Sequence, residues 1–314
     1  MDNAVVDAAR QALGPVGVCL PVSLTSTPSA DLQREAVGRL EHAGYRAVWT
    51  NEVIGKDAFV QLAMLLAATE RMVFGTCIAN IWARSAQTTH AASAQLAQAY
   101  PGRFVLGIGV GYPEQAASTG QEFGTPLSTM RDCLDRMDSP TWPPAPDVAY
   151  PRIVAANGPK MLALAGEIAN GAMPAGLPPE FTARARRLLG PDKLLVVGLT
   201  VAPASDRDRA KAAARESISV RLGAPSYAAR MAGLGYSVQD IAEVSDRLVD
   251  ALVAHGDPAA VAAKVREHLV AGADHVTLLL PIGGEFATGV NQLEHLAPAL
   301  ADLVAGRTRD TVRA

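Results

Sequence analysis

The chain has 314 residues, 49% of them hydrophobic and 19% charged, and its 28 basic and 31 acidic side chains give a formal net charge of −3. This balance argues against a general polyanion binder and against nucleic acid as a partner, and the composition excludes a disordered chain. The cysteines Cys19, Cys77 and Cys133 are too few and too scattered for a disulfide framework or a zinc site.

The sequence also bears on the cellular location of the protein and on metal binding. The N-terminus lacks a basic segment followed by an apolar one, and the apolar runs fall short of the roughly 20 residues that cross a bilayer. We therefore expect a cytoplasmic protein with no membrane partner. No metal site is expected, because the histidines form neither an H-x-x-x-H nor an H-E-x-x-H pair.

Short apolar runs alternate with longer segments of helical periodicity along the chain. Strands are predicted over 16–21, 46–49, 72–79, 104–109, 153–156, 171–175, 194–201 and 275–280. Helices are predicted over 29–44, 58–70, 86–100, 159–169 and 257–272. Ser29 and Asp257 are suited to N-caps, and Gly44 and Gly272 to helix ends. Eight strands, nearly all separated by helices, predict an α/β protein with a (β/α)8 barrel.

Length allows two domains, yet barrels of this size commonly form one. We therefore expect a single barrel domain over 1–314. The polar helical stretch of about 205–250 exceeds one connection and is predicted to be an insertion before the last strand. The proline-containing segment of about 112–150 is predicted to be rich in loops.

The fourth predicted strand ends in a glycine-rich sequence, GIGVG at 107–111. It is not a dinucleotide-binding fingerprint, because Tyr112 stands where the third glycine of G-x-G-x-x-G belongs and Pro113 follows where the helix would open. Two explanations remain open. The strand end is kept free of side chains so that a flat ligand approaches the backbone, or the glycines line a turn of the barrel.

Polar residues follow three other strands, at the end where a barrel carries its site. Asn80 and Trp82 come after the third strand, where they either build a site or form a turn and pack on a neighbouring loop. Glu52 comes after the second strand, either as a buried acid or base or as an exposed rim carboxylate. The turn NGPK at 157–160 opens a helix, and either binds a phosphate or is a plain connection.

Several of these segments match a known family. The run VFGTCIANIWAR at 73–84 and the run YPGRFVLGIGVG at 100–111 resemble the luciferase-like monooxygenase family, and more narrowly its actinobacterial branch that uses the deazaflavin coenzyme F420. The segments 155–161, 169–171 and 271–276 are similar to later strands of the same family. The resemblance is weakest over 120–150 and 205–245.

The resemblance implies a TIM-like barrel that binds F420 in a cleft at the carboxyl ends of its strands. It also implies a non-prolyl cis peptide bond at Cys77 and Ile78, against which the ring stacks. The cofactor-binding positions carried over are Cys77, Ile78, Ala79, Asn80 and Trp82 after the third strand, Gly107 and Gly109 beside the ring, Asn157, Gly158 and Pro159 at the phosphate, and Met173, Pro174 and Ala175 after the sixth strand.

Two departures from the family pattern concern the proton donor. Asn51 and Glu52 stand where many F420 enzymes of this family carry an Asp-His pair, and Gly111-Tyr112 replaces the Ser-His that relatives carry after the fourth strand. The usual histidine acid is therefore missing from both places. Glu52 and Tyr112 are the candidate replacements, and Asn80 completes the set of candidate catalytic residues.

Three hypotheses for the function follow. The first is an F420-dependent oxidoreductase that transfers a hydride between the deazaflavin C5 and a small organic substrate, in either direction. The second is an FMN-dependent monooxygenase of the same superfamily, supplied with reduced flavin by a partner reductase. The third is a non-catalytic barrel that binds flavin or F420. By analogy with the family, the protein is expected to be a homodimer.

Overall fold

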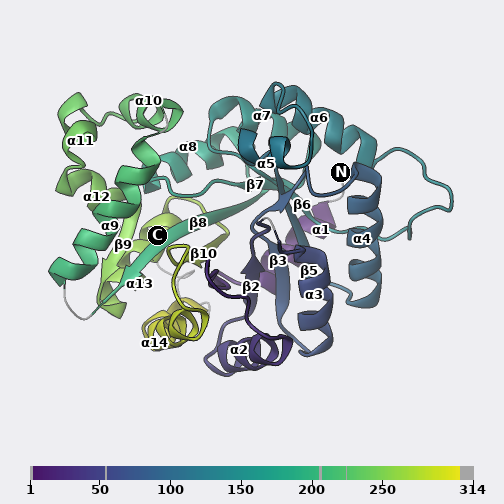
Figure 1. The fold of residues 1–314 in the computed structure, drawn as a ribbon, viewed down its shortest axis with the longest axis horizontal. Coiled ribbons are helices and arrows are strands. Elements are labelled where there is room, and N and C mark those ends of the chain that lie inside the picture. The colour runs from purple at the N-terminus through teal and green to yellow at the C-terminus, as the bar shows by residue number, and fades with distance from the viewer. Residues whose placement is uncertain (1–2, 54, 205–206, 224, 305–314) are drawn as a thin grey trace, which may run out of the picture.

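The computed structural model describes residues 3–53, 55–204, 207–223 and 225–304 (Figure 1). Its centre is a closed parallel barrel, in which each strand pairs with its neighbours and the last strand pairs with both the seventh and the first. The barrel strands are β1 (Val16–Cys19), β2 (Ala47–Thr50), β3 (Val73–Thr76), β5 (Phe104–Gly109), β6 (Arg152–Ala155), β7 (Gly171–Met173), β8 (Leu194–Pro203) and β10 (His275–Leu279). The barrel predicted from the sequence is therefore confirmed, with each predicted strand in its place.

Two short strands differ from the predicted pattern. β4 (Ala79–Asn80) overlaps the end of the strand predicted over 72–79, which the structure interrupts after Thr76, and it pairs with β5. β9 (Val253–Gly256) pairs with β8 from Thr200 to Pro203, starting at the residue where the pairing of β8 with β10 ends. Sequence analysis missed β9 because it follows a helix without an intervening turn residue.

Helices surround the barrel and are capped as their sequences indicate. They are α1 (Asn3–Leu13), α2 (Ala30–His42), α3 (Ala58–Ala67), α4 (Ala86–Ala99), α5 (Pro113–Ser118), α6 (Pro126–Met137), α7 (Pro159–Ile168), α8 (Pro179–Leu189), α9 (Arg207–Leu222), α10 (Pro225–Gly233), α11 (Val238–Glu243), α12 (Asp246–Leu252), α13 (Pro258–Val270) and α14 (Phe286–Val304). The side chains of Ser29 and Asp257 accept hydrogen bonds from Leu32 N and Ala260 N, as the N-cap predictions require. Sequence analysis did not predict α1, α8 or α14. In the part of the chain that is described, no helix is long and apolar enough to cross a membrane.

The helices α9 to α12 follow β8 over the stretch where an insertion is expected, and they lie together on one side of the barrel (Figure 1). The segment between β5 and β6 is largely irregular, but it contains α5 and α6. Both segments therefore contain more than one helix, whereas β1 and β2, for example, are joined through α2 alone.

The apolar core has two parts because buried parallel strands present alternate side chains to opposite faces. One part lies between the sheet and the surrounding helices. The other fills the barrel and includes Trp49, Val105 and Met173 together with Val6 and Leu13 of α1. Helix α1 therefore closes the amino-terminal end of the barrel.

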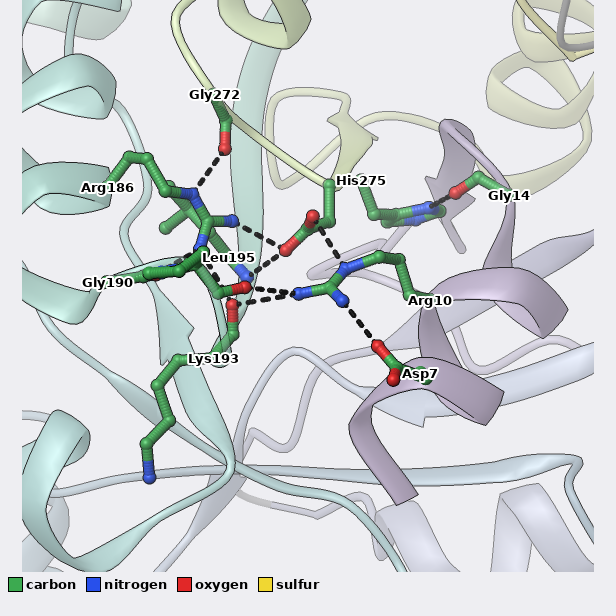
Figure 2. A network of polar contacts seen from close by, with 11 residues as sticks. Asp7, Arg10, Gly14, Arg186, Gly190, Lys193, Leu195, Gly272 and His275 are labelled. Carbon is green, nitrogen blue, oxygen red and sulfur yellow. Dashed lines mark hydrogen bonds and ion pairs between the residues drawn. The ribbon is translucent and has the colours of Figure 1, made fainter. Parts of the chain in front are cut away.

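A polar network at that same end joins four segments (Figure 2). The Asp274 carboxylate accepts hydrogen bonds from Arg10 Nε at 2.8 Å, from Arg186 Nη2 at 2.6 Å and from Leu195 N at 2.8 Å. Arg186 also donates to Gly272 O at 2.9 Å. Because the catalytic end of such barrels is the opposite one, this network is assigned to stability.

Candidate active site at the carboxyl ends of the barrel strands

The peptide bond between Cys77 and Ile78 is cis. It lies between the end of β3 and the start of β4, where Cys77 N donates to Thr50 O of β2 at 2.7 Å. The side chains of Cys77 and Ile78 pack against the apolar cluster inside the barrel and are half-buried. The cis bond that the family resemblance implies is therefore present at the expected position.

Gly107 and Gly109 are required by the packing of β5 against this bulge. A Cβ atom on Gly107 would lie 2.0 Å from Thr76 O, and one on Gly109 would lie 2.4 Å from Ile78 Cδ1. Thr76 Oγ1 also donates to Gly107 O at 2.6 Å and accepts from Gly107 N at 2.9 Å. These contacts show that close approach of neighbouring strands requires both glycines, a reason that neither of the two explanations drawn from the sequence includes. Sequence analysis passed over Thr76, although it directly precedes the bulge.

Glu52 is buried, so the exposed rim carboxylate considered from the sequence is wrong. Its side chain is 3% exposed and forms an ion pair with Arg84, whose Nη1 and Nη2 contact both carboxylate oxygens at 3.0 and 2.5 Å. The same oxygens accept from Asn80 N at 2.8 Å and Ala58 N at 3.0 Å. Every oxygen of Glu52 is thus engaged in holding the turn after β3 against the start of α3.

Asn80 and Trp82 form the turn that follows the bulge. Asn80 Oδ1 accepts from Trp82 N at 3.0 Å, and the Trp82 indole Nε1 donates to Val110 O at 2.7 Å. Trp82 is only 7% exposed and packs on Phe123 with ring centroids 5.9 Å apart. These contacts match the interpretation of both residues as a turn and its packing, and they tie the turn to the end of β5.

Tyr112 lies apart from this network. It precedes α5 as its N-cap residue, its backbone N donates to Gln115 Oε1 at 2.9 Å, and 71% of the residue is exposed. The structure therefore leaves the Tyr112 side chain largely exposed in the turn between β5 and α5.

The ends of β6 and β7 are joined through Asn157, whose Oδ1 accepts from Ala175 N at 2.9 Å. α7 begins directly afterwards with Gly158 as N-cap and Pro159 at its first turn, and a Cβ on Gly158 would meet nothing within 4 Å. Met173 is buried inside the barrel, and Pro174 O accepts from Gly198 N of β8 at 2.8 Å.

Most of the predicted site residues form one continuous arc. It runs from Glu52 to Asn80, from Ile78 across Gly109 to Ala155, and from Asn157 to Ala175. Tyr112 is the exception, because its hydrogen bonds within the described part of the chain all go to α5. The arc spans the carboxyl ends of β2 to β7, where ligand sites of such barrels are built.

Sequence analysis did not single out Lys56, which lies at the end of β2 and close to the Cys19 thiol at the end of β1. Lys56 Nζ donates to Thr50 Oγ1 at 2.7 Å and to Asn51 Oδ1 at 3.1 Å. A hydrogen bond with the Cys77 thiol and the charge of Lys56 lower the pKa of Cys19, whereas the same thiol contact and burial raise the pKa of Cys77. Cys77, the thiol on the bulge, is therefore held in its neutral form.

A parallel (β/α)8 barrel with a cis peptide bond after its third strand defines the class of the protein. A family model described as luciferase-like monooxygenase matches residues 15–275. The chain therefore belongs to the luciferase-like monooxygenase family, and with it to the oxidoreductases.

Two curated relatives are named for redox enzymes. A Mycobacterium tuberculosis protein, whose name assigns it coenzyme F420-dependent oxidoreductase activity, is 29% identical over 172 residues, which is 45% of this chain. This chain spans about half, 50%, of that relative. A 5,10-methylenetetrahydromethanopterin reductase of Methanolobus tindarius is 26% identical over 289 residues, covering 77% of this chain and 88% of the relative.

Solved structures share the fold at low sequence identity. The coenzyme F420-dependent tetrahydromethanopterin reductase of Methanopyrus kandleri has a TM-score of 0.70 at 19% identity, over 91% of this chain and 99% of that one. The oxygenating constituent of 3,6-diketocamphane monooxygenase from Pseudomonas putida, in complex with FMN, has a TM-score of 0.67 at 17% identity, over 93% and 98%.

Proposed function

We propose that the protein is an F420-dependent oxidoreductase that transfers a hydride between the deazaflavin C5 and a small organic substrate. The position of Cys77 and Ile78 carries the proposal, because these half-buried residues follow the third barrel strand, where the family resemblance places the ring. The name of the curated Mycobacterium tuberculosis relative supports F420 as the cofactor in preference to FMN. The single-domain organisation, the cytoplasmic location and the homodimer remain part of this proposal.

The residues around the bulge fit a planar ring. Cys77 and Ile78 are half-buried at the top of an apolar interior that Trp49 and Met173 already fill. A flat ligand therefore rests on this surface instead of entering the barrel. Beside it, Gly158 and Pro159 open α7 without a side-chain cap among the described residues, which leaves N–H groups suited to a phosphate.

When bound, F420 supplies the carbon that donates or accepts the hydride. The chain's own residues then position the substrate and move a proton. Glu52 holds the Asn80 turn through its ion pair with Arg84, so we assign it a positioning role. Tyr112 is the proposed proton donor, because it is exposed after the end of β5 and both carboxylate oxygens of Glu52 are already hydrogen-bonded.

Titration of the purified protein with F420 and, in parallel, with FMN tests the proposal by fluorescence quenching. We expect tighter binding of F420. Preference for FMN would favour the hypothesis of an FMN-dependent monooxygenase. One structural neighbour is a monooxygenase component solved in complex with FMN. Binding of F420 without turnover of any substrate would favour the non-catalytic barrel.

Gly158→Glu provides a matched test of the phosphate position. The substitution adds a negative charge where a Cβ meets no neighbour, so the fold is expected to persist. F420 affinity should fall about tenfold or more, because a like charge opposes a phosphate at the helix N-terminus. Gly38→Glu on α2, where a Cβ also meets nothing within 4 Å, is the control and should leave affinity unchanged.

A further inference from the structure

Helix α9 places an arginine against the carboxyl ends of β7 and β8. Arg221 Nη2 donates to Thr200 Oγ1 of β8 at 2.8 Å, and Thr200 is buried. The same guanidinium lies against Gly176, since a Cβ there would be 2.1 Å from Arg221 Nη1. The insertion thus delivers a positive charge to the backbone that directly follows Met173–Ala175.

Helix α10 carries a second arginine, one turn from a tyrosine that contacts the same glycine. Tyr227 donates its hydroxyl hydrogen to Gly176 O at 2.7 Å and is buried. Arg230 is three residues further along the helix, which puts it on the same face one turn away. Arg230 is half-buried, and burial lowers the pKa of its guanidinium.

Neither arginine forms an ion pair with a carboxylate among the described residues. Other arginines of the insertion are neutralised: Arg215 pairs with Asp246, and Arg247 pairs with Asp240 at 3.2 Å. Two partly desolvated cations without a counter-ion are costly. Such an arrangement is typical of a site whose counter-ion arrives with a ligand, because functional sites retain local costs that a structural role does not explain.

The position of the pair points to the substrate. Gly176 follows Ala175, whose backbone N donates to Asn157 Oδ1, so Arg221 adjoins the arc of predicted site residues on the side of β7 and β8. Arg230 lies one helical turn from Tyr227, which donates to the same glycine. In Figure 1, α9 and α10 belong to the group of helices beside β8, away from α7, whose N-terminus is the proposed phosphate position.

We propose that Arg221 and Arg230 bind an oxyanion, a carboxylate or a phosphate, carried by the substrate. The inference rests on the proposed function in one respect, namely that the substrate reacts at the barrel mouth. Guanidinium groups suit this ligand, because their planar N–H donors match two oxygens of a carboxylate or phosphate.

Isothermal titration with inorganic phosphate and with the dicarboxylate glutarate tests the site without any cofactor. The wild type should bind at least one of these probes, and Arg221→Gln and Arg230→Gln should each weaken binding about tenfold or more. The control is Arg187→Gln on the exposed face of α8, which should bind as the wild type does. The proposal would be overturned if the wild type bound neither probe. It would also be overturned if a variant that combines Arg221→Gln with Arg230→Gln bound the probe as the wild type does.

Titration of the same variants with F420 identifies the source of the anion. Unchanged F420 affinity together with lost phosphate binding supports an anionic substrate. A parallel loss of F420 affinity would overturn that assignment, because the arginines would then hold the cofactor's own phosphate. If the wild type binds phosphate through both arginines but binds no F420, the anion site stands and the proposed function fails.

Thermal unfolding guards against a trivial loss of fold. Arg230→Gln removes a half-buried charge with no carboxylate partner in the described chain, so its melting temperature should equal or exceed that of the wild type. A lower melting temperature would assign Arg230 a structural role and overturn its part in the site.

Discussion

The indole of Trp49 donates a hydrogen bond from Nε1 to Nε2 of His275 at 3.0 Å, inside the barrel. Because an indole nitrogen only donates, His275 Nε2 is an acceptor and the ring carries its proton on Nδ1, which donates to Gly14 O at 2.6 Å. The pair links β2, β10 and the chain that follows α1. Burial lowers the pKa of His275 to about 4.

This relationship predicts a loss of stability in acid. The pKa of His275 in the folded protein, about 4, lies below its ordinary value of about 6.5. Between pH 4 and pH 6.5 this histidine is therefore protonated in the unfolded chain and neutral in the folded chain. The free energy of unfolding should therefore fall as pH decreases from 6.5 towards 4, by about 3 kcal/mol from His275. Urea unfolding across this range measures it. His275→Gln should flatten the slope, and an unchanged slope in this variant would contradict the assignment.

Glu52→Gln should destabilise the fold by about 3 kcal/mol, because Arg84 would lose its buried counter-ion. Urea unfolding measures the change. Glu167→Gln, which breaks an exposed ion pair with Arg131 at 2.8 Å, is the control and should have no measurable effect. Full stability combined with lost turnover in Glu52→Gln would instead make Glu52 the proton donor.

Gly107→Ala should prevent normal folding or cost more than about 3 kcal/mol, because its methyl group would lie 2.0 Å from a backbone oxygen. Gly158→Ala is the matched control, since its Cβ meets nothing within 4 Å and its φ is −147°. Differential scanning calorimetry should show a lower melting temperature only for the first. Equal stability of the two variants would refute the packing role of Gly107.

Asp274→Asn should lower the free energy of unfolding by about 3 kcal/mol, because Arg10 and Arg186 would lose a shared, largely buried carboxylate. F420 affinity should stay the same, since the network lies at the opposite end of the barrel. Asp7→Asn removes a 71% exposed partner of Arg10 and should cost less than about 1 kcal/mol. A loss of F420 affinity in folded Asp274→Asn would contradict the division between the two ends.

Tyr112→Phe should reduce kcat about a hundredfold while F420 affinity stays unchanged, because a general acid typically contributes that much. The measurement is the rate of change of F420 absorbance with a substrate found by screening. Tyr100→Phe, at the end of α4, is the control and should retain activity. Unchanged turnover in Tyr112→Phe would remove the phenol from the proposed mechanism.

Local sequence patterns were sufficient for the barrel. Strands such as Leu194–Pro203 are continuous apolar runs because both faces of a covered parallel sheet are buried, and caps such as Ser29 mark helix starts through their own side chains. The family resemblance added the position of the cis bond at Cys77–Ile78.

Tertiary structure alone decided which polar groups are buried and what they contact. Glu52 meets Arg84 across 32 residues and becomes a positioning group, although its sequence context also suits an exposed rim. Arg221 reaches Thr200 from a helix that resembles a solvated insertion in sequence. The physical reason is that periodicity reports which side of an element is apolar, whereas the charge and reactivity of a polar side chain depend on long-range contacts that remove its water.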